Sequence, residues 1–134
     1  MTKSRAKLPD TNTILRYLLK DHEELHSRAA AFFEDVRTGK ENALILESVV
    51  VECVYVLTKY YRVPRGETAA ILSRLLGYRG VVNDDRQELT DALTLFSESK
   101  MDIVDCVLFA KARNYGLILY TFDKELAAKL KDRG

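Results

Sequence analysis

Short apolar runs alternate with longer amphipathic segments along this chain, and that alternation limits the folds open to it. Three apolar runs are short enough to be buried strands, at residues 43–46, 81–82 and 117–120. Apolar residues recur at helical spacing in the segments between them, which predicts helices over residues 11–20, 21–37, 49–61, 64–76, 85–97 and 103–115. Strands that alternate with helices favour an α/β fold with a parallel sheet covered on both faces.

Length and composition predict one domain over residues 1–134, because a chain with 47% hydrophobic residues can bury a core of that size. The 21 Lys and Arg nearly balance the 20 Asp and Glu, so the protein could bind a polyanion only through a local basic patch. Cys53 and Cys106 lie inside apolar runs and are expected as buried thiols. No run approaches ~18 apolar residues, and the first residues lack the apolar centre of a signal peptide. We therefore expect a soluble, cytoplasmic protein with no membrane partner.

Four acidic residues interrupt or border apolar runs: Asp10, Glu52, Asp105 and Asp123. Asp123 directly follows the apolar run 117–120, and Asp10 lies at the front of a helix, where open parallel sheets form their ligand crevice. Glu52 and Asp105 lie among apolar neighbours on two helices. Because burying an unpaired carboxylate costs several kcal/mol, we expect the four to gather around a cation. Oxygen-only ligands favour Mg²⁺ or Mn²⁺, and an open site of this kind suits phosphodiester hydrolysis.

Each of these acids also has an ordinary structural interpretation. Asp10 and Asp123 precede helical segments and could simply start them. Asp105 lies in the first turn of a helix, where the helix dipole favours an acid. Glu52 could be an ordinary solvated residue on the polar face of its helix. Taken singly, none of the four specifies a function, and the functional interpretation depends on their conjunction.

Four segments follow one another in a characteristic order: PDTNTILRYLL, VVVECVYVLTKYYRVPRGE, MDIVDCVLFAKARNYG and TFDKEL. They resemble the PIN-domain ribonucleases, in particular the VapC-type toxins of bacterial toxin–antitoxin pairs, over almost the whole chain. The resemblance implies a three-layer α/β/α sandwich and Mg²⁺-dependent cleavage of RNA. It also implies a homodimer and a small antitoxin protein that silences the toxin. The four acids of the family fall on Asp10, Glu52, Asp105 and Asp123.

The chain departs from the family pattern before its first acid. The family runs an apolar strand into that acid, whereas this chain offers little more than Leu8 before Pro9, so the first strand is expected to be short or poorly paired. Two other acids compete for positions in the site, Glu47 for the second and Asp102 for the third. Asp102 is expected as a capping group or a group behind the site.

Candidate substrate contacts lie near these acids. The segment at residues 58–65 interleaves two tyrosines with Lys59, Arg62 and Arg65. Such a composition could hold phosphates and stack bases, although a solvated helix end is the more ordinary explanation. Arg16 could neutralise a phosphate or pair with a carboxylate of an antitoxin, or have an ordinary surface role. Asn12 and Thr121 could orient water or the acids.

Two other functions remain open from the sequence. His22, Glu23 and His26 form HEELH, which fits the zinc-peptidase pattern of two helical ligands and a general base. Its charged surroundings favour a solvated helix, and the chain has only two histidines, so a third ligand would have to be a downstream carboxylate. A catalytically silent PIN-like module that only binds RNA or a partner is the second alternative. The intact set of four acids favours the enzyme.

Overall fold

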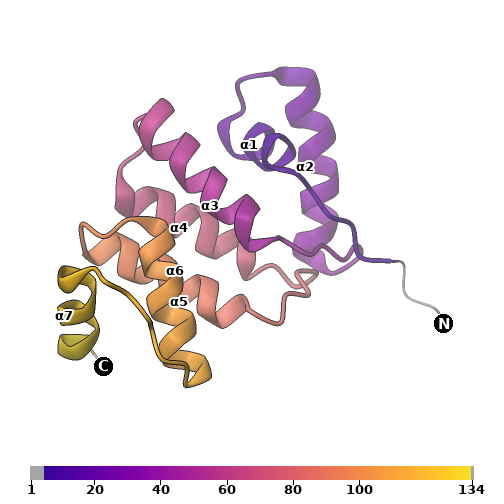
Figure 1. The fold of residues 1–134 in the computed structure, drawn as a ribbon. Helices are drawn as coiled ribbons and strands as arrows, with labels where there is room; N and C mark the ends of the chain where they lie inside the picture. Colours follow the sequence, from indigo (N-terminus) through magenta and orange to yellow (C-terminus); the bar gives the residue numbers. More distant parts are fainter. Residues whose placement is uncertain (1–4, 134) are drawn as a thin grey trace.

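The computed structural model describes residues 5–133, and helices make up most of it (Figure 1). In chain order they are α1 (Thr11–Leu19), α2 (Glu23–Thr38), α3 (Glu47–Tyr55), the π-helix η1 (Val56–Tyr60), α4 (Arg65–Leu76), α5 (Arg86–Glu98), α6 (Ile103–Tyr115) and α7 (Lys124–Arg133). Each predicted helix is present with ends shifted by no more than two residues. The π-helix continues α3 without a break and was not predicted.

Side chains at the cap positions fix where several helices begin. The side chains of Asp10, His22 and Asp102 each accept a backbone N–H from the first turn of α1, α2 and α6, respectively. These bonds satisfy amide donors that have no partner within a helix. The helix α3 instead begins at Glu47, with Leu46 at its cap position and no capping side chain. The sequence-based interpretation of a helix starting after Ser48 is therefore wrong by two residues.

The predicted central sheet of a three-layer sandwich is not confirmed, because the described residues contain only three short extended pieces joined by isolated bridges. Lys7 forms a parallel bridge with Ala43, and Ala43 forms another with Val81. The amide N–H of Lys7 donates to Asn42 O at 2.8 Å, and that of Val82 donates to Ala43 O at 2.9 Å. No strand longer than these bridges occurs among residues 5–133. The pairing direction agrees with the predicted sheet, and the weak pairing before Asp10 agrees with the sparse apolar sequence there.

Gly80 allows the third extended piece to approach the end of α2. A Cβ atom at this position would lie 2.0 Å from Glu41 O and 2.8 Å from Val36 O. The Gly80 N–H donates to that same Val36 carbonyl at 2.8 Å, while its own carbonyl accepts from Ala43. A side chain here would therefore push apart two backbones that the pairing holds together.

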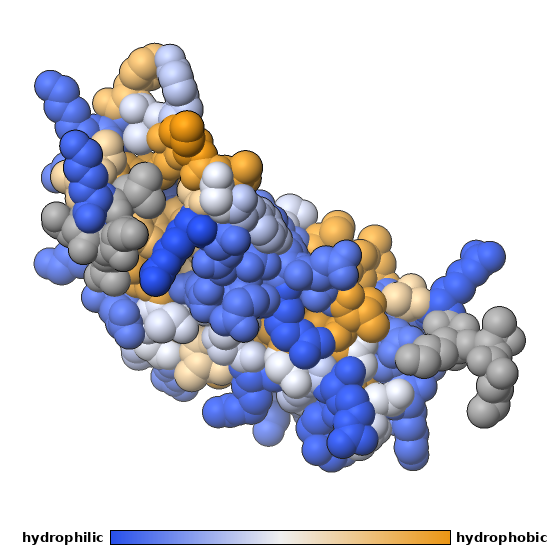
Figure 2. Space-filling view, turned by 90° about the horizontal axis from the view of Figure 1, so that it is seen from below, coloured by the Kyte–Doolittle hydropathy of each residue, from blue (hydrophilic) through white to orange (hydrophobic). Residues whose placement is uncertain are grey.

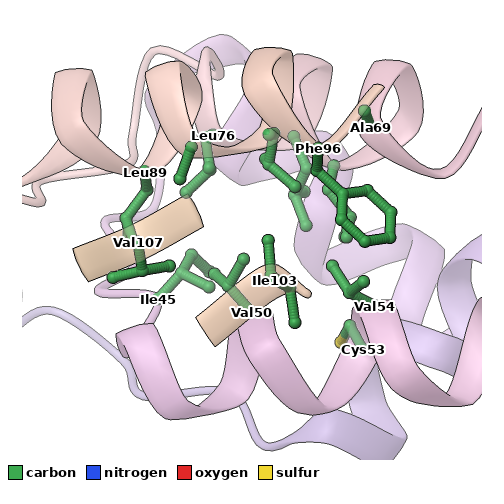
Figure 3. Packing of buried hydrophobic residues seen from close by; sticks show 14 of the residues in the cluster. Ile45, Val50, Cys53, Val54, Ala69, Leu76, Leu89, Phe96, Ile103 and Val107 are labelled. Atoms are coloured by element: carbon green, nitrogen blue, oxygen red, sulfur yellow. The ribbon is translucent and has the colours of Figure 1, made fainter. Parts of the chain in front are cut away.

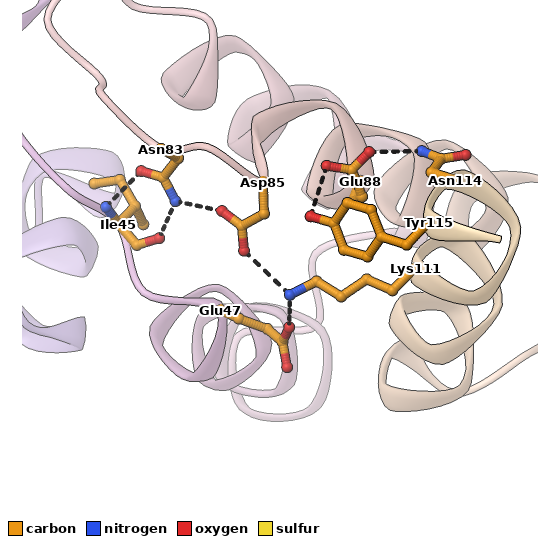
Figure 4. A network of polar contacts seen from close by, with 8 residues as sticks. All are labelled: Ile45, Glu47, Asn83, Asp85, Glu88, Lys111, Asn114 and Tyr115. Atoms are coloured by element: carbon orange, nitrogen blue, oxygen red, sulfur yellow. Dashed lines mark hydrogen bonds and ion pairs between the residues drawn. The ribbon is translucent and has the colours of Figure 1, made fainter. Parts of the chain in front are cut away.

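Beyond the bridges, a group that we call the strand-end network joins the ends of two extended pieces to helices (Figure 4). Its members are Glu47, Asn83, Asp85 and Lys111. The Asn83 amide accepts from the N–H of Ile45 at 2.8 Å and donates to the carbonyl of Ile45 at 2.6 Å and to Asp85 at 3.0 Å. Lys111 Nζ lies 2.5 Å from Glu47 Oε1 and 3.2 Å from Asp85 Oδ2. One asparagine thus satisfies backbone groups that a longer strand pair would have satisfied.

The hydrophobic core lies between α3, the pair α4 and α5, and α6. In Figure 3, Val50 of α3, Phe96 of α5 and Ile103 of α6 point into the space between these helices, and Ile45 lies beside Val50. On the face shown in Figure 2, hydrophilic side chains cover most of the surface, and hydrophobic atoms gather in separate patches. Among the described helices, none is long and apolar enough to cross a membrane.

Both cysteines are buried and unbonded, as predicted. Burial raises the pKa of Cys53 to about 12 and that of Cys106 to about 11. The two thiols therefore stay protonated and act as small apolar core groups.

Candidate functional site

Asp10 is the first of the four acids, and it caps α1. Its Oδ1 accepts from the N–H of Thr13 at 2.9 Å and from the hydroxyl of Thr13 at 2.8 Å. These bonds, led by the backbone one, lower the pKa of Asp10, so the carboxylate is held ionised. Within the described part of the chain, no hydrogen bond involves Oδ2 of Asp10. The capping role therefore leaves one oxygen of an exposed carboxylate available.

Asp10 shares a pocket with the second acid. The pocket has a volume of about 260 Å³, lies between α1 and α3, and is lined by Asp10, Thr11, Asn12, Ser48, Val49 and Glu52. Glu52 is exposed on α3 one turn beyond Ser48. Asp10 and Glu52, which are more than forty positions apart in the chain, thus line one pocket. This agrees with the expectation that the acids converge.

Asp105 lies in the first turn of α6 and is partly buried. Its pKa is raised, first by loss of solvation and then by the charges of Asp102 and Asp123, while Lys129 on α7 acts in the opposite direction. Two other acids therefore lie close enough to make ionisation of Asp105 unfavourable. A cation at this position would reverse that effect.

Asp123 caps α7 and forms the last acid of the set. Its Oδ1 accepts from the N–H groups of Glu125 at 3.0 Å and Leu126 at 3.1 Å, and its own N–H donates to Thr121 Oγ1 at 3.0 Å. Thr121 therefore positions the acid through its backbone. As at Asp10, capping occupies only Oδ1 within the described part of the chain.

Contacts between α3 and α6 distinguish the competing acids, Glu47 and Asp102, from the candidate acids Glu52 and Asp105. Tyr55 donates its hydroxyl to Asp102 Oδ1 at 2.6 Å near one end of the helix pair, and Lys111 binds Glu47 near the other end. The two helices therefore run antiparallel, and the turns that carry Glu52 and Asp105 correspond to each other between these contacts. Glu47 is held in an ion pair, and Asp102 acts as the expected cap.

The hydroxyl of Tyr55 also affects the electrostatics of Asp102. This hydrogen bond is the first cause of the lowered pKa of Asp102, and the phenol pKa of Tyr55 rises to about 12 in return. Asp102 is thus an ionised, satisfied carboxylate directly behind the turn that carries Asp105.

We call Asp10, Glu52, Asp105 and Asp123 the acidic row, because they follow one another in two neighbouring pairs. Asp10 and Glu52 share the pocket, and Asp105 and Asp123 interact electrostatically. Among the side chains that the structure describes, no three of His, Cys, Asp or Glu are close enough together to hold a metal ion. The expectation that all four gather at one point is therefore only partly met in this structure.

Two expectations about these acids are wrong. Asp10, Glu52 and Asp123 are exposed and Asp105 is only partly buried, so they do not lie in the core. Asp10 and Asp123 do not stand together at one sheet edge either, because residues 117–120 form no strand and Asp123 lies beside Asp105 instead. Apolar neighbours along the sequence predicted burial, but on these helices the acids face outward.

Two of the predicted substrate residues, Asn12 and Arg16, lie near Asp10. Asn12 and Arg16 line a second pocket, of about 460 Å³ between α1 and α2, together with Arg28 and Phe32. Arg16 also binds Asp21 at 3.0 Å. Arg28 was not predicted as a residue of this pocket. The only signal in the sequence is its position on the face of α2 that lies against α1.

The basic segment 58–65 divides into exposed and structural residues. Lys59 lies 5.0 Å from the centre of the Tyr55 ring, Tyr60 is 77% exposed, and Arg62 is exposed with a φ of 59°. Arg65 instead lies 3.6 Å over the Phe96 ring and donates to two backbone carbonyls. The interpretation of Arg65 as a phosphate contact is therefore wrong.

The zinc-peptidase pattern does not form on a helix. His22 has an extended backbone and caps α2, with its Nδ1 accepting from Leu25 N–H at 3.2 Å. His26 lies inside α2, with Nδ1 3.1 Å from Arg16 O. The pattern requires both histidines to project from one helical face, and here one of them precedes the helix.

Comparisons with known proteins agree with the resemblance seen in the sequence. Residues 7–131 match the family described as PIN domain. A VapC ribonuclease from Aquifex aeolicus (strain VF5) is 25% identical over 111 residues, which cover 83% of this chain and 82% of that protein. No solved structure matches the chain significantly. Because the family match spans nearly the whole sequence, the chain belongs to the PIN domain family.

Proposed function

We propose that this protein is a metal-dependent endoribonuclease whose catalytic surface is the acidic row. The observation that carries the proposal is electrostatic. Among the side chains that the structure describes, none forms an ion pair with an acid of the row, whereas Glu47 and Asp85 share the ammonium of Lys111. Carboxylates that the fold leaves without cations are suited to an external one. The name of the relative, a VapC ribonuclease, supports RNA as the substrate.

The donor chemistry of the acidic row fits a hard divalent cation, Mg²⁺ or Mn²⁺. All four side chains offer oxygen only, and the capping acids Asp10 and Asp123 keep an oxygen that capping does not use. When bound, such an ion lowers the pKa of a water molecule and stabilises charge on a phosphate. The ionised form of Asp105 would be stabilised most, because loss of solvation and then the neighbouring acids raise its pKa. The two pairs of the row must approach each other for all four to contribute.

The chain's own residues would orient the RNA along this surface. Lys59 and Arg62 provide charge for phosphates, and the exposed Tyr60 ring provides a face for an unstacked base. Arg16 and Asn12 lie beside Asp10 and could bind a phosphate or orient a water molecule there. Thr121 would act indirectly, through the N–H of Asp123 that it holds. Ser48, which lines the pocket of Asp10 and Glu52, is a further candidate to bind this water.

We further propose that the nuclease is the toxin of a type II toxin–antitoxin system, as a homodimer that a small antitoxin protein silences. The similarity to a VapC ribonuclease supports this role. Such an antitoxin would have to cover the acidic row or supply cations to it.

Cleavage of labelled single-stranded RNA with Mg²⁺ or Mn²⁺ tests the activity, comparing wild type with Asp10→Asn. Asn keeps the side-chain oxygen that accepts from Thr13, so α1 stays capped and the variant should fold. Cleavage should fall by at least about a hundredfold, since a metal-binding charge is lost. The matched control is Asp84→Asn, which removes an exposed acid outside the row. Equal cleavage by wild type and Asp10→Asn would exclude this site.

A silent PIN-like binding module remains the second candidate, because the four acids do not form a closed metal site as they lie. The same assay separates the two functions. Wild type that binds the labelled RNA but leaves it intact with both cations and with EDTA would be a binding module.

A further inference from the structure

A pocket of about 460 Å³ lies between α1 and α2, which run side by side (Figure 1). Asp10 lines both this pocket and the smaller one that it shares with Glu52. The pocket therefore adjoins the acidic row, and its volume is in the range that holds small ligands. An RNA chain that has a phosphate at Asp10 and continues toward α2 would reach it.

The α2 wall of this pocket carries a cation next to an aromatic ring. Arg28 and Phe32 both line the pocket and are four positions apart on α2, so their Cβ atoms are roughly 5–6 Å apart. The Phe32 ring lies edge to face with Phe33, at 4.9 Å between ring centroids, and packs against the core. Arg28 is exposed. The core therefore holds the ring in place, while the guanidinium beside it can reach a ligand.

The charges around the pocket leave Arg28 available to an anion. Arg16, on the α1 wall, is paired with Asp21 at 3.0 Å. Among the side chains that the structure describes, none forms an ion pair with Arg28. Asp10 is the acid that lines the pocket, and in the proposed function the metal ion takes up its charge. An anion in this pocket would therefore be bound first by Arg28.

We propose that this pocket binds the RNA nucleotide next to the cleaved bond, with Arg28 on its phosphate and Phe32 against its base. The inference rests on the proposed function, since it extends the RNA path from the acidic row. A guanidinium beside an aromatic ring suits a phosphate and an unstacked base. Asn12, on the α1 wall, offers a hydrogen-bond donor and an acceptor to the base edge. An acidic peptide would use the guanidinium and leave the ring without a matching group.

Steady-state cleavage of labelled single-stranded RNA gives the first test. Arg28→Gln should raise KM at least about fivefold and change kcat by less than about twofold, because the lost contact holds the substrate equally before and during the reaction. The matched control is Arg113→Gln, at an exposed arginine in the last turn of α6, whereas Asp105 lies in the first turn. The control should behave as wild type. An unchanged KM in Arg28→Gln, whatever its kcat, would overturn the proposal.

Equilibrium binding of the same RNA in EDTA, followed by fluorescence anisotropy, tests the phosphate contact without cleavage. The logarithm of the affinity should fall linearly with the logarithm of the salt concentration, and Arg28→Gln should reduce this slope by about 0.7, the value for one phosphate of a single strand. Arg113→Gln should keep the wild-type slope.

The two assays separate failure of the pocket from failure of the proposed function. Wild type that cleaves RNA, with Arg28→Gln keeping the wild-type KM and slope, would disprove the pocket and leave the nuclease standing. Wild type that does not cleave, with the slope reduced in Arg28→Gln, would refute the nuclease and support the pocket as an RNA-binding site. If Arg28→Gln loses affinity for an oligoglutamate peptide but not for RNA, the pocket binds protein and the proposal is overturned.

RNA with a base removed at one position at a time tests the role of Phe32. In wild type, one such position should weaken binding at least about fivefold, the lower limit for stacking a base on an aromatic ring. In Phe32→Leu, which keeps an apolar side chain against the core, the same position should matter less than about twofold, since no ring remains to stack on. Circular dichroism checks that the variant folds. Equal sensitivity of the two folded proteins at every position would exclude Phe32 as the base contact.

Discussion

The strand-end network and the acidic row differ in whether their carboxylates have a cationic partner. In the network, two acids share one lysine and an asparagine completes the backbone bonding (Figure 4). In the acidic row, the four carboxylates form no ion pair with a described residue. Two of them, Asp10 and Asp123, are stabilised instead by the backbone N–H groups of the helices that they cap. The network acids are therefore neutralised within the fold, whereas the acids of the row keep charge that a bound cation could neutralise. Substitutions that remove a partner in the network and a substitution that removes the charge of Asp105 should therefore have opposite effects on stability.

Asn83→Ala should have the largest effect, because one amide serves two backbone groups of Ile45 and the carboxylate of Asp85. Its loss leaves partly buried backbone groups without partners, and we expect a loss of about 2–4 kcal/mol in the free energy of unfolding. Urea denaturation followed by circular dichroism measures it. Asp84→Ala, at an exposed neighbouring residue, is the control and should change stability by less than about 0.5 kcal/mol. A loss at Asn83 as small as the control would show that the network does not stabilise the strand ends.

Lys111→Met should have an intermediate effect. The substitution keeps most of the apolar stem but leaves Glu47 and Asp85 without their shared cation. Because all three side chains are partly exposed, we expect a loss of only about 1 kcal/mol in unfolding free energy. A double-mutant cycle with Glu47→Gln should show coupling between the two positions, measured by the same denaturation experiment. Strictly additive effects would mean that the ion pair contributes nothing.

Asp105→Asn should have the smallest effect and the opposite sign. The raised pKa of Asp105 means that its ionisation disfavours the folded state, fully so above the folded-state pKa. At about pH 7 the variant should gain about 0.5 kcal/mol, the scale of one like-charge contact. The gain should vanish as pH falls below the usual Asp range, where the wild-type carboxyl is protonated in both states. Denaturation curves at the two pH values measure this, and a loss of stability at pH 7 would assign Asp105 a structural role.

Helices could be predicted from this sequence because their apolar spacing and caps are local. The bounds of α6 follow from Asp102 before it and Gly116 after it, which has a φ of 66° as a helix end requires. Strand pairing is not local. Residues 117–120 have the composition of a buried strand, yet they extend across the surface, and nothing in their own sequence specifies a partner.

The sequence proposes which residues form the candidate site, but it does not predict their geometry. Spacing and resemblance singled out the acidic row, but apolar neighbours wrongly indicated burial. The choice between Glu52 and Glu47, and between Asp105 and Asp102, depends on Lys111 and Tyr55, which lie on facing helices. Such contacts across α3 and α6 cannot be read from either segment alone.

Binding of Mn²⁺, followed by isothermal titration calorimetry, tests most directly whether the acidic row serves an external cation. Wild type should bind the ion, and Asp10→Asn and Asp105→Asn should each weaken binding by at least about tenfold. Glu47→Gln, in the strand-end network, should bind as wild type does. Unchanged affinity in both acidic-row variants, or loss of binding only in Glu47→Gln, would contradict the account.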